Sequence, residues 1–190
     1  MNLDHAETNI AFKEWAAVCA ALGAGRQTII LRKGGIQEGR EGFRVRHRQF
    51  WLYPTHFHQV ANGLKKGAAQ SLEMQPPAGE LHLRQLAVVE DVVELKSEIA
   101  AQALAGWHCW SAETINERFH YRQPGLFLLL ARVFNRRQPH LVRETPELAG
   151  CKSWVELPAP LAADELTPAL PDAEFSAQAA EIRAALTGGG

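Results

Sequence analysis

The segment Leu126–Phe134, LFLLLARVF, restricts the fold of this chain more than any other feature. An apolar run of this length, with neither glycine nor proline inside it, is typical of a strand that is covered on both faces. Arg132 is the exception in the run, and a charged side chain there must lie at an end of the strand, face a cleft or be paired. The sequence therefore predicts a central β-strand that carries one constrained arginine.

The composition is that of one globular domain. The chain has 190 residues, of which 46% are hydrophobic and 22% charged, which is enough for one core. Its longest apolar run, Leu126–Ala131, is far shorter than the ~20 residues of a membrane span, and the start of the chain lacks the pattern of a signal peptide. We therefore expect a cytoplasmic protein with no membrane partner. Cys19, Cys109 and Cys151 are odd in number and widely spaced, which supports neither a disulfide framework nor a cysteine zinc site.

Hydrophobic periodicity and turn residues divide the chain into short elements. In Asn9–Gly23 the apolar residues recur at helical spacing, and Thr55 and Ser111 stand where helix N-caps are expected. The predicted helices are Asn9–Gly23, Thr55 to about Lys66, a short helix after Ser97, a helix after Ser111 and Asp172–Leu186. The predicted strands are Gln27–Lys33, Phe43–Val45, Gln49–Tyr53, Leu81 to about Glu90, Trp107–Trp110, Leu126–Phe134 and Trp154–Leu157.

This order of elements predicts one α+β domain over residues 1–157. We expect a curved, mostly antiparallel sheet packed with three to four helices, and a small open barrel would suit the same order. After Leu157 the composition changes to proline, alanine and acidic residues, which predicts an extended linker over residues 158–171 and a Pro/Ala-rich acidic tail. Residues 172–190 are expected to form a C-terminal helix and a frayed glycine end.

Charge is divided unevenly along the chain although the net charge is only -1. Residues 26–66 contain nine Lys and Arg against two Glu, whereas residues 144–190 contain eight Asp and Glu against two Lys and Arg. The basic segment is suited to phosphate, and equally to the chain's own acidic tail. The sequence leaves both readings open.

Aromatic residues are interleaved with the basic ones in this segment. Arginine neutralises phosphate and aromatic rings stack on bases, which is how many proteins recognise single-stranded nucleic acid. A solvated basic strand above an aromatic core explains the same pattern without a ligand. The candidate ligand-binding residues are Arg32, Lys33, Arg44, Arg46, Trp51, Thr55, His58, Arg118, Arg132 and Lys152.

Three functions fit these residues. The first is a non-enzymatic module that associates with DNA or RNA. The second is an enzyme acting on a phosphorylated or anionic small substrate, for which Arg32, Lys33, His58, Arg118 and Lys152 must converge on one pocket. The third is a protein-interaction domain whose acidic tail binds a partner. No catalytic residue is assigned, and binding is favoured over catalysis.

No metal site or cofactor is predicted. His56 and His58 lie about 200° apart around a helix and cannot both reach one ion, although an extended chain would place them on one face. Cys109 beside His108, and Cys151 beside Lys152, would become nucleophiles if a nearby cation favoured the thiolate. Neighbours on a strand point apart, however, so structural cysteines explain both pairs better.

Several blocks along the chain share their order and spacing with one protein family. They are Phe12–Trp15, Leu31–Ile36, Phe50–Thr55 with His58 and Gln59, His108–Ser111, Arg118 with Phe119, Arg132–Phe134, and Gly150–Val155. Over roughly residues 9–157 the chain resembles the bacterial family catalogued as domain of unknown function 1802. The resemblance carries over no catalytic residue, because the activity of that family is not established. Some members resemble partners or fusions of restriction-endonuclease-like domains, which implies a place in restriction-modification or defence systems.

Overall fold

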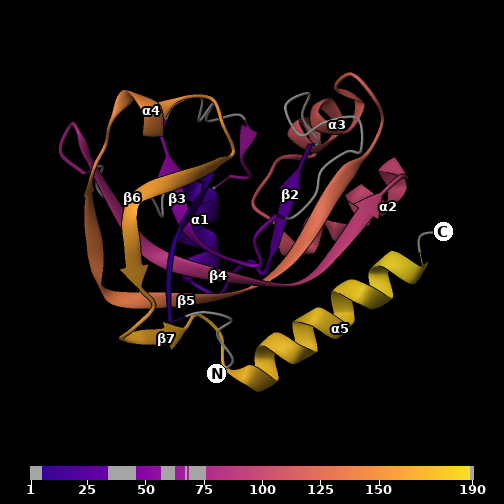
Figure 1. The fold of residues 1–190 in the computed structure, drawn as a ribbon. Coiled ribbons are helices and arrows are strands. Elements are labelled where there is room, and N and C mark those ends of the chain that lie inside the picture. Colours follow the sequence, from indigo (N-terminus) through magenta and orange to yellow (C-terminus); the bar gives the residue numbers. More distant parts are fainter. Residues whose placement is uncertain (1–5, 34–45, 57–62, 67, 69–75, 189–190) are drawn as a thin grey trace.

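The computed structural model describes residues 6–33, 46–56, 63–66, 68 and 76–188. They form one sheet with helices around it (Figure 1), so the predicted single α+β domain is confirmed. The strands are β1 (Glu7–Trp15), β2 (Ile29–Arg32), β3 (Gln49–Thr55), β4 (Glu80–Leu95), β5 (Leu126–Arg143), β6 (Trp154–Ala162) and β7 (Leu166–Pro168). The helices are α1 (Ala16–Gly23), α2 (Glu98–Ala103), the 3₁₀ helix η4 (Leu104–Trp107), α3 (Ala112–His120), α4 (Pro146–Ala149) and α5 (Asp172–Gly188).

The sheet is mostly antiparallel and open. Its strand order is β2-β5-β4-β3-β1-β6, and β7 pairs with β5 beyond the end of β2. Only β1 and β3 run parallel among the described pairs. β2 and β6 stand at the two ends of the order, and the described chain has five α-helices where three to four were expected.

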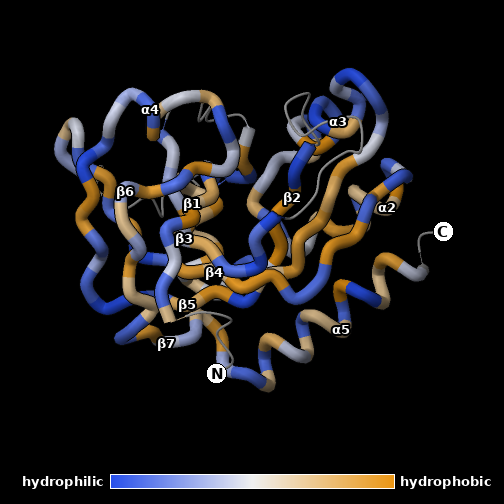
Figure 2. Tube along the Cα trace, viewed as in Figure 1, coloured by the Kyte–Doolittle hydropathy of each residue, from blue (hydrophilic) through white to orange (hydrophobic). Residues whose placement is uncertain are grey.

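β5 contains the segment predicted to be a central strand, and it lies between β2 and β4. Its ladder with β4 is long, and the register shifts between Leu83 and Gln85 and again between Val89 and Asp91. Such irregularities bend a strand and increase its twist. The two strands therefore curve around the core (Figure 1), and Figure 2 shows hydrophobic residues along their central part. This confirms the curved sheet.

The first element differs from the helix predicted over Asn9–Gly23. Residues up to Trp15 form β1, and the helix begins only at Ala16. The helical spacing of apolar residues was misleading because β1 lies between β3 and β6 and is buried on both faces, including Phe12 and its neighbour Ala11. A strand covered on both faces carries no alternating pattern that would distinguish it from a buried helix.

Thr55 ends a strand and does not cap a helix. It is the last residue of β3 and pairs with Trp15 of β1 in parallel register. Its Oγ1 donates a 3.1 Å hydrogen bond to the backbone oxygen of Glu14. Pro54 is tolerated in this strand because β4 pairs with β3 only as far as Trp51, so its missing N–H faces no β4 partner. Residues 57–62 of the predicted helix lie outside the described residues, as does the predicted strand Phe43–Val45.

The C-terminal segment packs on the domain, where the sequence predicted a linker over 158–171. β6 continues past Leu157 to Ala162 against β1, and β7 pairs with β5. β6 is an edge strand, so prolines at its free edge cost no ladder hydrogen bonds. The predicted helix after residue 171 is confirmed as α5, which buries Phe175, Ala179 and Ile182 in the core. In the described residues, no helix is both long and apolar enough to cross a membrane.

Two hydrophobic clusters cover the two faces of the sheet. Phe50 and Leu52 belong to the larger cluster, which includes residues of α1, α2, α3 and α5. The intervening Trp51 and the following Tyr53 belong to the smaller cluster. Successive side chains of a strand point to opposite faces, so β3 separates the clusters.

Candidate functional site

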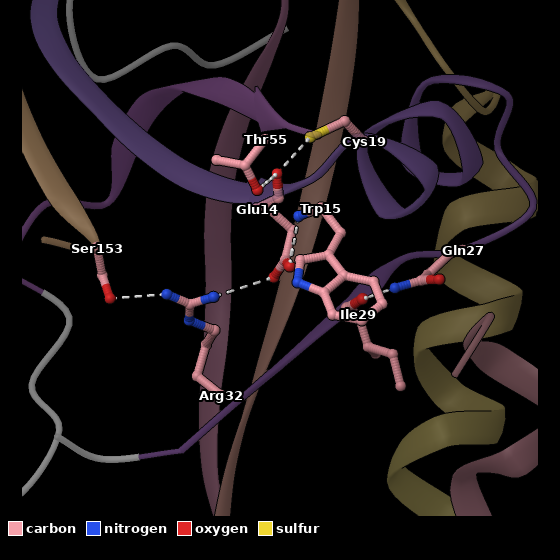
Figure 3. Close-up of polar contacts among 8 residues, drawn as sticks. All are labelled: Glu14, Trp15, Cys19, Gln27, Ile29, Arg32, Thr55 and Ser153. Atoms are coloured by element: carbon pink, nitrogen blue, oxygen red, sulfur yellow. Dashed lines mark hydrogen bonds and ion pairs between the residues drawn. The ribbon is translucent and has the colours of Figure 1, made fainter. Parts of the chain in front are cut away.

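A fully buried carboxylate stands at the rim, next to the end of β1. The side chain of Glu14 has no exposed surface, and its Oε2 lies 3.5 Å from Nη1 of Arg32. Its Oε1 accepts a 2.8 Å hydrogen bond from the backbone N–H of Trp15 (Figure 3). A buried charge persists only when it is paired and hydrogen-bonded. Glu14 meets both conditions and fixes the position of Arg32.

Arg32 connects the two ends of the sheet. It is the last residue of β2, and its guanidinium lies 4.5 Å from the ring centre of Phe12. Its Nη2 donates a 2.7 Å hydrogen bond to Oγ of Ser153, the residue just before β6 (Figure 3). The sheet therefore curls until its end strands, β2 and β6, are joined by side chains.

Lys33 holds the loop after α3. Its ammonium donates hydrogen bonds to the backbone oxygens of Phe119, at 2.9 Å, and Gly125, at 2.8 Å, and also to that of Gln123. Carbonyls at the end of a helix lack partners within the helix, and a lysine satisfies them well. Burial lowers the pKa of Lys33. Its three N–H groups are committed to these carbonyls, so Lys33 contributes charge rather than a free donor.

Arg122 lies in the loop that Lys33 holds. Its φ of 63 places it in the left-handed region, which costs a residue with a side chain about 1 kcal/mol or more. Its guanidinium lies 4.9 Å from the ring centre of Tyr121. The backbone of this loop is thus fixed by Lys33, and the loop presents an exposed arginine to the pocket beside it.

An open pocket of about 930 Å³ lies beside these residues. Exposed Arg46, Arg122 and Lys152 line it together with Lys33, against the acidic Glu147 and Glu156. The four basic residues come from segments that are far apart in the sequence. The balance of four basic and two acidic side chains gives the pocket a positive potential.

Aromatic rings form part of the same pocket. The rings of His47 and Trp154, which both line it, meet edge to face with their centres 5.5 Å apart. Trp154 is fixed from behind by Phe12, at 4.5 Å, and by Phe50, at 5.0 Å between ring centres. The pocket therefore joins basic side chains with a rigid, half-buried tryptophan, and this combination suits a planar anionic ligand.

Arg118 of α3 lies close to this network but outside the pocket. Its guanidinium lies 3.9 Å from the ring centre of Trp110 and 5.4 Å from that of Trp15. Burial lowers the pKa of Arg118, while the nearby carboxylate of Glu14 raises it and the charge of Arg32 lowers it further. Arg118 and Arg32 therefore share one electrostatic environment.

The sequence model of a protein family described as "Domain of unknown function (DUF1802)" matches residues 11–181. The chain belongs to the DUF1802 family. The match extends well into α5, so the C-terminal segment is part of the family's domain. A comparison with curated proteins finds no match.

Among solved structures, this DUF1802 chain is similar to the ASCH protein of Zymomonas mobilis. The structure titled "Crystal structure of ASCH from Zymomonas mobilis" is 14% identical, with a TM-score of 0.43, over 90% of this chain and 93% of that one. A serine-to-alanine variant of the same protein gives 15% identity and a TM-score of 0.45, over 91% and 94% of the two chains. A tyrosine-to-phenylalanine variant gives 12% and 0.44, over 90% and 96%. These values are too low to transfer a ligand or activity.

The structure of the DUF1802 domain brings some predicted site residues together. Lys33, Arg46 and Lys152 line the pocket, and Arg32 is bonded to Ser153 in its wall. Arg118 is electrostatically coupled to Arg32. Arg44 and His58 lie outside the described residues. Three residues of the predicted set thus lie around one pocket.

Three further residues of the predicted set, Trp51, Thr55 and Arg132, do not line this pocket. Trp51 is fully buried in the smaller core cluster, on the face of β3 opposite to Phe50 and Leu52. Thr55 is bonded to the backbone of β1. Arg132 is paired with Glu90 at 3.3 Å and Asp172 at 2.5 Å, away from the pocket, which satisfies its predicted need for a partner.

The acidic tail pairs with the chain itself, and among the described residues no ion pair joins it to the basic segment 26–66. Asp172 reaches Arg132, and Asp164 and Glu165 reach Arg136 of β5, at 3.1 and 3.5 Å. Because these acids are already occupied, the structure does not support a protein partner that binds the tail. In the described residues, the basic side chains of the pocket form no ion pair with it.

Sequence reasoning missed Arg122, Glu14, Ser153 and Trp154 as parts of the site. Glu14 follows Lys13 and resembles any surface acid in sequence, and its pairing with Arg32 depends on tertiary contacts. Arg122 had a signal, because the Pro124–Gly125 turn marks a loop after a helix, and loops carry binding residues more often than the elements they connect.

Proposed function

We propose that this DUF1802 domain is a non-enzymatic nucleic-acid-binding module that holds a single strand in the basic pocket. The observation that supports this most is the convergence of Arg46, Arg122 and Lys152 from three separate segments around one pocket. Exposed cations around a concave surface attract phosphates, and this attraction is stronger when few acidic side chains lie between the cations. The charge of Lys33 adds to this field.

The aromatic wall supports a nucleic acid over a simple anion. Bases of an unpaired strand stack on exposed aromatic faces, and each such contact contributes about 1–3 kcal/mol. His47 and Trp154 stand in the same pocket as the cations, and Trp154 is held rigid by two phenylalanine rings. A rigid ring loses little entropy when a base stacks on it. Bases in a duplex are already stacked, so a single strand fits this wall better.

Binding is tested by fluorescence anisotropy with labelled 12-nucleotide DNA and RNA, single- and double-stranded, across a salt series. We expect single strands to bind more tightly than duplexes, and the logarithm of the affinity to fall linearly with the logarithm of the salt concentration. No binding at low salt, or an affinity that is unaffected by salt, contradicts the proposal.

Matched variants locate the surface. Arg46→Gln and Lys152→Gln should each weaken binding and reduce the salt slope by about 1 when the residue contacts a phosphate. Arg137→Gln is the control, because Arg137 is an exposed arginine of β5 that does not line the pocket. Equal losses in all three variants would indicate non-specific attraction to the whole protein and would sink the assignment to the pocket.

A small phosphorylated or anionic molecule is the second candidate ligand. The pocket volume lies in the range of small-molecule sites, roughly 300–1,000 Å³, and the hydroxyl of Ser153 and the exposed thiol of Cys151 line it. A mononucleotide that competes as well as the 12-nucleotide strand at equal concentration favours this alternative. A place in restriction-modification or defence systems is implied by the family resemblance alone and stays a prediction.

A further inference from the structure

Arg118 and Arg132 each stack on an aromatic ring, and they differ in what accepts their hydrogen bonds. Arg132 lies 4.4 Å from the ring centre of Phe175 and donates to both Glu90 and Asp172. Arg118 lies 3.9 Å from the ring centre of Trp110. In the part of the chain that the structure describes, no oxygen accepts a hydrogen bond from its guanidinium. Arg118 is thus held in place like Arg132 but keeps its forked donors available.

The charges around Arg118 do not cancel. Glu14 is the carboxylate that acts on it, and Glu14 is already bound to Arg32 and to the backbone of Trp15. Cys109 supplies no negative charge near neutral pH, because burial raises the pKa of its thiol to about 11. One carboxylate therefore faces two guanidiniums, and this partly buried cluster carries one surplus positive charge. A charge removed from water is stabilised by a counter-charge.

An unsatisfied donor lies in the same cluster. The indole Nε1 of Trp110 is buried and has no hydrogen-bond partner among the described residues. Buried polar groups are nearly always bonded, so this indole N–H is a donor that a further acceptor would satisfy. Arg118, with its planar fork stacked on a ring, has the arrangement that proteins use to bind phosphate and carboxylate groups through two parallel hydrogen bonds.

We infer that Arg118 binds an oxyanion, a phosphate or carboxylate group, at a site beside the Trp110 ring that is separate from the basic pocket. The anion supplies the second negative charge, because the single carboxylate of Glu14 cannot neutralise both Arg32 and Arg118. It also accepts hydrogen bonds from the N–H groups of Arg118. Neither Arg118 nor Trp110 lines the pocket. The inference therefore goes beyond the proposed binding of a single strand and does not depend on it.

Thermal unfolding tests the site with inorganic phosphate, acetate and chloride at matched ionic strength. An anion that binds only the folded state raises the melting temperature, by about 3–5 °C at ten times its dissociation constant for a chain of this size. We expect phosphate or acetate to give this rise in the native chain and in Arg132→Met. We expect Arg118→Met to lose the rise and Arg118→Lys, which keeps the charge but not the fork, to reduce it.

A merely structural Arg118 gives a different result. Its replacement would then lower the melting temperature in chloride, and phosphate would raise the melting temperature of all variants equally. Under the proposed role, Arg118→Met melts no lower than Arg132→Met in chloride, because it removes a surplus charge. Lys152→Met separates this site from the pocket, since the rise must persist in that variant. A rise that persists in Arg118→Met, or that chloride produces equally, overturns the inference.

Discussion

Arg32 and Ser153 are 121 positions apart, and the 2.7 Å hydrogen bond from Nη2 of Arg32 to Oγ of Ser153 joins the two end strands of the sheet. β2 and β6 share no backbone ladder in the described residues. The open sheet thus curls toward a barrel and is closed by side chains at its rim. The same arginine neutralises buried Glu14. Arg32 therefore both links the two ends of the sheet and positions Ser153 in the wall of the pocket.

Replacement of Arg32 should therefore be costly. Arg32→Met leaves the fully buried Glu14 without its ion-pair partner, and loss of one partner of a buried pair costs about 3 kcal/mol or more. The free energy of unfolding in urea measures the loss. Ser153→Ala is the matched comparison, because it keeps the ion pair and removes one hydrogen bond, at about 1 kcal/mol. A loss for Arg32→Met no greater than that for Ser153→Ala would show that Glu14 does not depend on this pairing.

His108 makes the stability of the domain depend on pH. The side chain is buried, both ring nitrogens lack partners among the described residues, and its pKa is lowered to about 4, first by burial and then by the charge of Lys65. The unfolded chain binds this proton near pH 6.5, so it binds more protons than the folded chain between pH 6.5 and 4. Stability is therefore full above pH 6.5 and falls as the pH approaches 4, by about 2–4 kcal/mol for this group.

The contribution of His108 is isolated by comparison with His108→Phe. This variant keeps a planar ring and has no nitrogen to protonate or leave unbonded, so its stability at pH 7 should equal or exceed that of the native chain. Urea unfolding at pH 7, 6, 5 and 4.5 should show a shallower acid decline in the variant. Parallel curves for the two proteins would mean that other groups cause the decline.

The fold could be predicted where local pattern and tertiary environment agree. Leu126–Phe134 is apolar except for Arg132, and it forms the first half of β5. Ser111 caps α3 as expected, since its side chain accepts from the N–H of Thr114. Residues 9–15 were misassigned because strands on both sides bury β1, and this information is not local. The prolines of β6 suggested a linker. They are compatible with a strand only because β6 lies at the edge of the sheet, and the sequence does not show this position.

The sequence names the basic residues of the candidate site but not their contacts. Arg32, Lys33 and Arg118 belong to the predicted basic and aromatic set, and their partners lie far away in sequence. Lys33 reaches the backbone of residues 86 to 92 positions further along the chain, and backbone oxygens carry no sequence signal. The sequence thus located the charges, while tertiary packing decided which of them are structural and which are free.

The C-terminal helix should be essential for stability. Ile182 of α5 is fully buried in the larger cluster, and Ile182→Ala should lower the free energy of unfolding by about 2–5 kcal/mol through lost burial and a cavity. Glu181→Ala is the control on the same helix, because Glu181 is exposed and its replacement should change stability by roughly 0.5 kcal/mol or less. Two equally small effects in urea unfolding would mean that α5 is a dispensable tail after all.

Cys151 reports on occupancy of the pocket. It is the exposed cysteine and lines the pocket, whereas Cys19 is buried and the pKa of Cys109 is raised to about 11 by burial. Because the thiolate is the reactive form, the folded chain at pH 8 should show one fast thiol toward a disulfide reagent and three after unfolding. Cys151→Ser should remove the fast phase. A bound 12-nucleotide single strand should slow the reaction of the Cys151 thiol several-fold in the native chain. If anisotropy shows full binding and the rate of this reaction is unchanged, the strand lies on another surface.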